Sequence, residues 1–246
     1  MQLPTEKTRP EINFSRSFSL IYGKPKVGKS SFCANMDDAL FAKTEEGLNF
    51  LKTYNVAISK WDDFLQLGAL LAKGDHKYKT LIVDTVGNLY QMCEDFVCTR
   101  DGMTDPSDEG FGKGFKRVKK EFHRVILKFQ QMGMGVVFIA HAKESVEKSK
   151  DISGTLRELT LLGPDLPGSG AKVINGMVDN ILYFYTGSDG KRWIQTTPTR
   201  YVTAGCRGDH KRSLPIEEKI PLDFDVFIDE YDRALAELNK GEEVNE

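Results

Sequence analysis

The sequence lacks any apolar run of the roughly 20 residues that a membrane-spanning helix needs. Its polar start, MQLPTEKTRPEINF, also lacks the apolar centre of a signal peptide. Cysteine is scarce and forms no CxxC pair, which argues against a zinc site and against a disulfide framework. We therefore expect a cytoplasmic protein with no membrane partner, whose reduced cysteines pack in its interior: Cys33, Cys93, Cys98 and Cys206.

An excess of charge of one sign is missing too. Thirty-four basic residues face 36 acidic ones, for a formal net charge of −2. The whole molecule therefore has no net attraction for nucleic acid, and a polyanion would have to bind a local basic patch. The 246 residues, 40% of them hydrophobic, suffice for one large α/β domain.

Apolar runs alternate with amphipathic stretches, which predicts an α/β fold with a mainly parallel central sheet flanked by helices. Residues 1–15 are interpreted as an N-terminal arm, 16–222 as the domain, and 223–246 as an acidic C-terminal helix and tail. Helices are expected over residues 28–36, 115–129 and 224–238. Strands are expected over residues 17–22, 39–43, 80–84, 135–141, 177–185 and 192–197, the last two forming an antiparallel hairpin across the turn sequence GSDG.

A glycine-rich loop follows the first predicted strand. It reads Gly23-Lys24-Pro25-Lys26-Val27-Gly28-Lys29-Ser30 and matches G-x-x-x-x-G-K-[ST]. In this motif backbone N–H groups converge on a β-phosphate at a helix N-terminus. Lys29 is expected to reach the β- and γ-phosphate oxygens, and the Ser30 hydroxyl to bind the metal, with Ser31 next in the nucleotide-binding segment. The predicted cofactors are ATP and Mg2+.

Three polar residues end predicted strands at the same sheet edge as the loop. Asp84 closes its strand as a Walker B acid does and is expected to hold Mg2+ through water. Because Thr85 follows it, the base that activates water must come from elsewhere; Glu45 is the candidate and Glu46 its rival. His141 can contact the γ-phosphate, so that loss of this phosphate on hydrolysis changes the position of the segment that follows His141. A histidine that only caps a strand fits the pattern nearly as well.

The order of these motifs resembles the RecA-type recombinase core, most closely the minimal RecA-like single-strand annealing proteins of bacteriophages. The resemblance runs from about Phe18 to about Leu214 and rests on FAKTEEGLNFL, LIVDT, and GFGKGFKRVKKEF followed by GVVFIAHAKE. His141 stands where RecA proteins usually carry glutamine. The resemblance implies a RecA-like P-loop NTPase fold, DNA-stimulated ATP hydrolysis with Glu45 as base, and an oligomer, filament or ring. Such an oligomer coats single-stranded DNA and promotes annealing or recombination beside a single-strand-binding protein.

In that family two loops face the DNA, and here they fall within residues 100–120 and 143–171. The first ends in a basic cluster that can neutralise phosphates, although a solvated helix face explains it equally well. The second is long and glycine-rich towards its end, and it contains no aromatic residue, so its contact with DNA is expected to be electrostatic and sequence-tolerant. The basic residues proposed for DNA contact are Lys113, Lys116, Arg117, Lys120, Lys143, Lys148, Lys150 and Arg157.

RecA-like filaments also place a basic residue of one subunit on the nucleotide of its neighbour. Arg207, between Gly205 and Gly208, is the first candidate here and Arg200 the second. Either residue is equally compatible with a plain surface arginine.

Two other functions share the loop. A small-molecule or nucleoside kinase transfers phosphate to a metabolite and normally carries a compact Arg-rich lid. This sequence lacks such a lid, although residues 143–172 could close over a substrate. An ATP-gated assembly module, such as a helicase loader, binds nucleotide to organise partners and needs no catalytic base.

Overall fold

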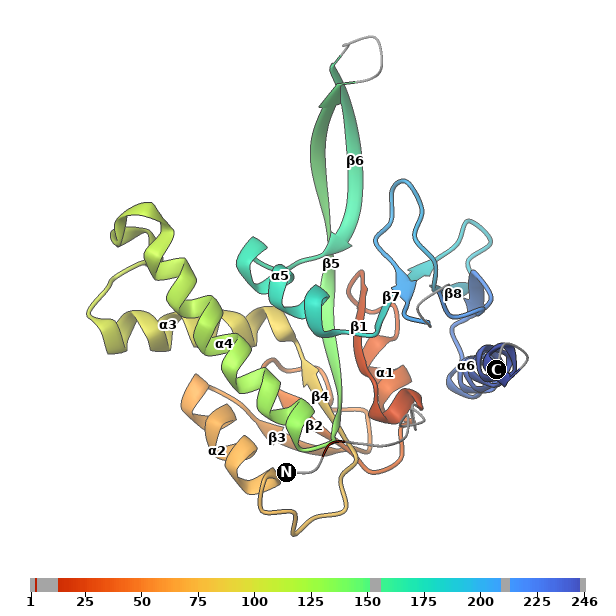
Figure 1. Ribbon diagram of the computed structural model, residues 1–246, viewed down its shortest axis with the longest axis horizontal. Coiled ribbons are helices and arrows are strands. Elements are labelled where there is room, and N and C mark those ends of the chain that lie inside the picture. The colour runs from red at the N-terminus through yellow and green to blue at the C-terminus, as the bar shows by residue number, and fades with distance from the viewer. Residues whose placement is uncertain (1–2, 4–12, 151–155, 209–212, 244–246) are drawn as a thin grey trace.

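The computed structural model describes residues 3, 13–150, 156–208 and 213–243, and residues 1–2 and 4–12 of the predicted N-terminal arm lie outside them. The described chain forms one mainly parallel sheet in the order β10-β8-β7-β1-β5-β4-β2-β3 (Figure 1). The predicted α/β fold is thereby confirmed. The strands are β1 (Phe18–Gly23), β2 (Ala39–Lys43), β3 (Tyr54–Ala57), β4 (Thr80–Asp84), β5 (Gly135–Lys150), β6 (Leu156–Pro164), β7 (Asn180–Thr186), β8 (Arg192–Gln195), β9 (Gly205–Cys206) and β10 (Lys219–Pro221).

Six α-helices in the described residues cover the two faces of the sheet. Helices α2 (Trp61–Leu71), α3 (Val86–Asp101), α4 (Lys113–Gln131) and α5 (Gly168–Met177) pack on one face, and α1 (Lys29–Cys33) and α6 (Phe224–Glu243) on the other (Figure 1). Successive residues of β1 point to opposite faces of the sheet. Leu20 and Tyr22 pack in the core beneath α2–α5, and Ile21 packs in the core beneath α1 and α6. Continuous apolar strands such as TLIVD therefore bury every side chain, as a doubly covered parallel sheet requires. Three short 3-10 turns, η1 (Phe14–Arg16), η2 (Pro106–Asp108) and η3 (Gly110–Gly112), complete the elements.

Strand β5 corrects the expectation for residues 143–171. It continues past His141 to Lys150 and pairs antiparallel with β6, and the stretch ends in the first turns of α5. The paired segments 142–150 and 156–164 leave the main sheet and stand out as a free ribbon (Figure 1). Prediction of an irregular loop was wrong because the ribbon meets the core only at its base, through Ala142 and Leu162, so the rest of its length has no apolar period that the sequence can display.

Several element ends also differ from the predictions. Strand β7 begins at Asn180, because α5 extends to Met177, and α1 is shorter than the predicted helix over 28–36. Phe115, placed in the apolar stripe of α4, is largely exposed because the first turn of that helix precedes its contact with the sheet. The antiparallel β7–β8 hairpin and the buried, free state of all four cysteines are confirmed.

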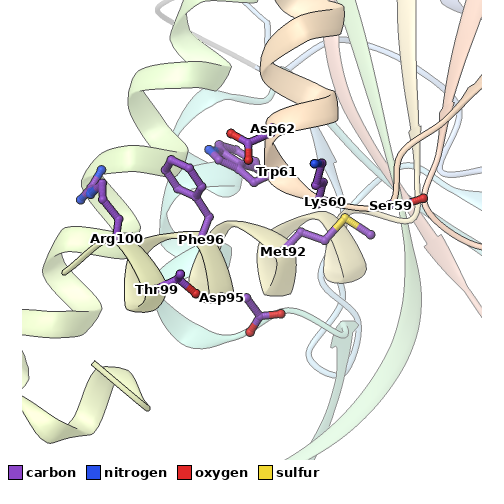
Figure 2. A pocket seen from close by; sticks show the side chains of 9 residues that line it. All are labelled: Ser59, Lys60, Trp61, Asp62, Met92, Asp95, Phe96, Thr99 and Arg100. Carbon is purple, nitrogen blue, oxygen red and sulfur yellow. The ribbon is translucent and has the colours of Figure 1, made fainter. Parts of the chain in front are cut away.

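A pocket also lies between two of the helices, away from the glycine-rich loop. Figure 2 shows a pocket of about 370 Å³ between the start of α2 and α3, lined among others by Lys60, Trp61 and Phe96. None of its lining residues belongs to the glycine-rich loop. Among the described helices, none is both long and apolar enough to cross a membrane.

Candidate nucleotide-binding site

The glycine-rich loop joins the end of β1 to the start of α1, as its motif requires. Gly28 caps α1 with φ +114°, a left-handed conformation that favours glycine. Gly23 meets β7 so closely that a Cβ there would collide with the Phe184 carbonyl oxygen. Both glycines therefore shape a loop that leaves its backbone N–H groups free to face an anion.

Lys29 is buried at the first position of α1. Its Nζ donates to the carbonyl oxygens of Gly23, at 2.9 Å, and Lys24, at 3.1 Å. Burial lowers the pKa of Lys29, and the nearby carboxylates of Asp84 and Glu45 partly offset that effect. The ammonium group is thus folded back over the loop, where it can turn to phosphate oxygens when they bind.

Ser30 and Asp84 form the oxygen pair expected for a magnesium site. The Ser30 Oγ donates to Asp84 Oδ2 at 2.6 Å, and Asp84 is almost fully buried. Burial raises the pKa of Asp84, while the hydrogen bond from Ser30 opposes the rise. Hydroxyl and carboxylate oxygens are the ligands that Mg2+ prefers, so the donor set fits this ion together with phosphates of a nucleotide.

The register of the parallel strands brings the remaining predicted side chains to this edge. Gly23 lies level with His141, and Asp84 with Lys43, just before the segment that carries Glu45. Thr44 holds that segment against the end of β4, because its Oγ1 donates to the Thr85 carbonyl oxygen at 2.9 Å and accepts from the Thr85 N–H at 2.8 Å.

Glu45 faces the site, whereas Glu46 pairs with the nearby lysine Lys43 at 3.0 Å. The Glu45 Oε1 lies 3.7 Å from His141 Nε2, and its Oε2 accepts from Asn88 at 3.3 Å. The Nδ1 of His141 is buried and has no hydrogen-bond partner among the described residues. The two side chains are part-exposed, so water and a γ-phosphate can reach them.

Arg192 is a site residue that sequence reasoning missed. It is the first residue of β8, its Nη1 lies 3.4 Å from the Val27 carbonyl oxygen, and a Cβ on Gly28 would lie 2.9 Å from the same nitrogen. No motif contains it, because only the antiparallel pairing of β8 with β7 carries it to the loop.

The two predicted trans arginines lie away from the loop of their own chain. Arg207 pairs with Asp179 at 3.0 Å and donates to the Val178 carbonyl oxygen at 3.3 Å, next to the start of β7 and so at the opposite edge of the sheet. Arg200 is exposed, with its guanidinium 6.0 Å from the Tyr201 ring centroid. A role on a neighbouring subunit stays a prediction for both.

The proposed DNA-contacting residues lie in two places. Lys143 and Lys148 are exposed on the ribbon, paired with Asp165 at 3.2 Å and Glu158 at 3.0 Å. Lys150 and Arg157 lie in β5 and β6, with side chains outside the described part of the chain. The remaining four are exposed along the start of α4, where only Arg117 has ion pairs among the described residues: Lys113, Lys116, Arg117 and Lys120.

A strand, a glycine-rich loop with a buried lysine, and a serine–aspartate pair at the carboxyl edge of a parallel sheet define a P-loop NTPase. The chain belongs to the AAA domain family AAA_24, whose profile matches residues 18–207. No curated protein gives a significant match to the sequence. Among the described residues no cluster of three or more histidine, cysteine or acidic side chains forms a separate metal centre.

Proposed function

We propose that this chain is a RecA-like ATPase that uses ATP and Mg2+, binds single-stranded DNA as an oligomer, and promotes annealing or homologous recombination. Bound Mg2+ supplies charge neutralisation at the β- and γ-phosphates. Lys29 adds a positive charge at the same oxygens, and the Glu45 carboxylate orients the attacking water and accepts its proton. Ser30 and Asp84 hold the metal position.

The observation that carries the proposal is the continuity of β5. This strand runs from the centre of the sheet, past His141 beside Glu45, directly into the exposed ribbon formed by residues 142–150 and 156–164 (Figure 1). A change at His141 on loss of the γ-phosphate would therefore act on the first residues of the ribbon without an intervening loop. An exposed ribbon joined directly to the strand of His141 suits a protein that couples nucleotide to a long polymer, whereas a metabolite kinase would need the same stretch to close over its substrate.

The first test is steady-state ATP hydrolysis, with and without single-stranded DNA, at low and high salt. We expect stimulation by DNA that weakens with salt and disappears in Lys29→Ala. Hydrolysis that ignores DNA at both salts would refute the DNA-binding part and favour a kinase. Glu45→Gln should retain nucleotide binding and lose hydrolysis; unchanged hydrolysis in that variant would remove Glu45 as the base.

Most of the ribbon can be removed while its base keeps Leu162, whose backbone bonds to Tyr22 and to Tyr201. Residues 146–160 can be replaced by Asn-Gly, which suits a two-residue hairpin turn between Ser145 and Leu161. We expect this variant to bind nucleotide as the wild type does and to lose stimulation by DNA. Full stimulation in the shortened protein would show that the ribbon is not the coupling element.

A further inference from the structure

Phe111 has a backbone and an exposure that its own chain does not explain. It is fully exposed and adopts φ 60° and ψ 27°, a left-handed conformation that is a rare outlier for a bulky side chain. An exposed aromatic ring in a disfavoured conformation gains nothing for folding. Features of this kind persist at binding sites, where the surrounding structure enforces them.

The backbone is anchored on both sides of Phe111. The turn that carries the exposed ring is therefore fixed by contacts of its own chain. Before it, Asp108 Oδ2 accepts from the N–H groups of Thr104 and Asp105 at 2.8 and 2.9 Å. After it, Gly114 packs so tightly on η2 that a Cβ there would collide with the Pro106 carbonyl oxygen.

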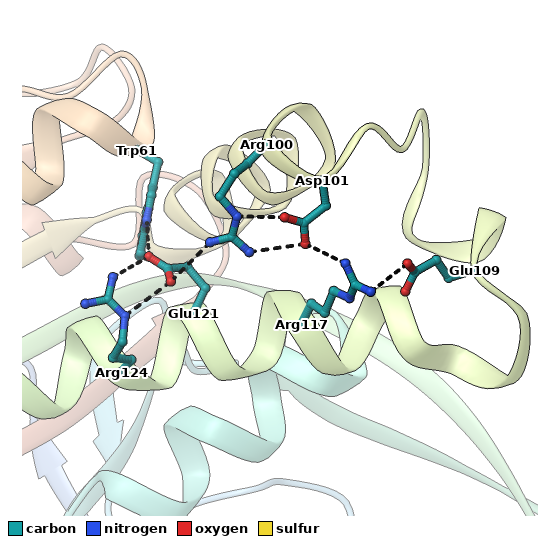
Figure 3. A network of polar contacts seen from close by, with 7 residues as sticks. All are labelled: Trp61, Arg100, Asp101, Glu109, Arg117, Glu121 and Arg124. Carbon is teal, nitrogen blue, oxygen red and sulfur yellow. Dashed lines mark hydrogen bonds and ion pairs between the residues drawn. The ribbon is translucent and has the colours of Figure 1, made fainter.

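An ion-pair chain adds a second anchor. Arg117 reaches back from α4 to Glu109 at 2.9 Å and to Asp101 at 3.0 Å (Figure 3). These contacts fix the residue two positions before Phe111 to the helix that follows it. The two carboxylates also neutralise the charge of Arg117, so this side chain is not available to bind an anion.

The neighbouring lysines are available. Four exposed lysines follow Phe111 on α4, and among the described residues none of them has an ion pair: Lys113, Lys116, Lys119 and Lys120. In the preceding turn, the carboxylates of Asp105 and Asp108 accept hydrogen bonds from the backbone of that turn. An aromatic ring beside a row of cations matches a base stacked on its face with its phosphates alongside.

We propose that Phe111 is a stacking platform for a base of single-stranded nucleic acid, whose backbone lies along the lysines of the first two turns of α4. The proposal rests on the single-strand binding put forward above and adds to it a mode of contact that the ribbon lacks. Stacking is tolerant of sequence, because every base has a π-face. A protein partner would prefer a contiguous apolar patch to one ring flanked by cations.

The test is equilibrium binding of a labelled thymidine oligonucleotide, followed by fluorescence anisotropy over a range of salt concentrations. We expect Phe111→Ala to weaken affinity about 5- to 100-fold with an unchanged slope of log affinity against log salt. Lys116→Ala should instead reduce that slope by about 0.7. Phe50→Ala, which removes the other fully exposed phenylalanine, is the matched control and should bind as the wild type does.

Two further variants separate stacking from folding. Phe111→Trp should keep the affinity and show quenched tryptophan fluorescence on binding, whereas Phe111→Gly should bind weakly with an unfolding temperature no lower than that of the wild type. Equal affinities of wild type and Phe111→Ala would overturn the stacking proposal alone. A wild type that binds no oligonucleotide at any salt would overturn the proposed single-strand binding as well.

Discussion

Arg192 lies on the side of the phosphate loop that faces away from Asp84 and Glu45. Asp84 ends β4 and Glu45 follows β2, on one side of β1 in the sheet, and Arg192 begins β8, on the other side. We therefore expect a triphosphate whose γ-phosphate points to Glu45 to extend its α-phosphate and nucleoside towards Arg192. The guanidinium is the only side chain of β8 that we find against the loop in the described structure.

We expect Arg192→Ala to weaken ATP and ADP equally, by about tenfold, which is the usual effect of losing one hydrogen bond to a charged group. Equilibrium titration with a fluorescent nucleotide measures both affinities, and Lys191→Ala, at the exposed residue next to Arg192, serves as the control. A loss for ATP alone would instead assign Arg192 to the γ-phosphate, and no loss for either would remove it from the site.

Asp84, proposed to hold the metal, destabilises the fold when it is ionised. Burial raises its pKa above the ordinary value of 3.8, so folding favours the protonated carboxyl. The stability contributed by this group is complete below the ordinary pKa and is lost as pH rises through the raised value. Asp84→Asn keeps an acceptor for Ser30 and avoids that loss.

The nucleotide-free Asp84→Asn variant should therefore unfold at a higher temperature than the wild type near about pH 7, with the difference shrinking towards about pH 4. Its ATP hydrolysis should fall by about a hundredfold or more, since the metal contributes several kcal/mol to the transition state. Thermal unfolding at the two pH values checks the first expectation; a lower unfolding temperature at neutral pH would contradict it.

At the level of elements, the carboxylate of Glu121 on α4 contacts side chains of both α2 and α3. Glu121 is buried and accepts from Trp61 Nε1 at 3.3 Å and from Arg124 Nη2 at 2.6 Å, and it lies 3.6 Å from Arg100 (Figure 3). Burial alone would raise its pKa, but the hydrogen bonds from Arg124 and Trp61 outweigh burial and set the pKa below its ordinary value. The stability that Glu121 contributes is therefore present above the ordinary pKa and is lost as pH falls through the lowered value.

Glu121→Ala should lower the free energy of unfolding by about 1–3 kcal/mol, because it leaves the buried indole N–H without an acceptor; the half-exposed arginines lose less. Denaturant unfolding measures the change, and Glu121→Gln, which keeps an acceptor, should lose less. Equal losses in both variants would mean that charge, not the hydrogen bond to Trp61, dominates.

At the scale of the whole molecule, bound nucleotide should stabilise the entire domain against unfolding. The loop and Asp84 belong to β1, α1 and β4, which carry the centre of the fold. MgATP at about 100 times its Kd should add about 2.7 kcal/mol to the free energy of unfolding and raise Tm by roughly 5–10 °C. Differential scanning fluorimetry measures this shift, and Lys29→Ala is the control; an equal shift in that variant would place binding outside the loop.

Much of the fold was predictable because it is local. Strands β1, β2 and β4 are short apolar runs that end at a glycine or a polar residue, and the long stripe of α4 has the helical period. The ribbon formed by residues 142–150 and 156–164 was not predictable, since it meets the core only at its base, through Ala142 and Leu162, and leaves no apolar period along the rest. Helix α3 was missed for a related reason: its sequence is only weakly amphipathic, and its burial comes from α4 and the sheet together.

The sequence by itself determined the phosphate loop and the order of the acid residues, because a loop between strand and helix is a short-range feature with its own backbone requirements. Tertiary structure decided which acid faces the site. Glu45 and Glu46 are adjacent in sequence, and Glu45 faces His141 in a segment held by the hydrogen bonds of Thr44 to Thr85 and of Asn88 to Glu45. Tertiary structure likewise brought Arg192 to the loop and left Phe111 exposed, because strand pairing and packing between distant segments have no signature in any single stretch of chain.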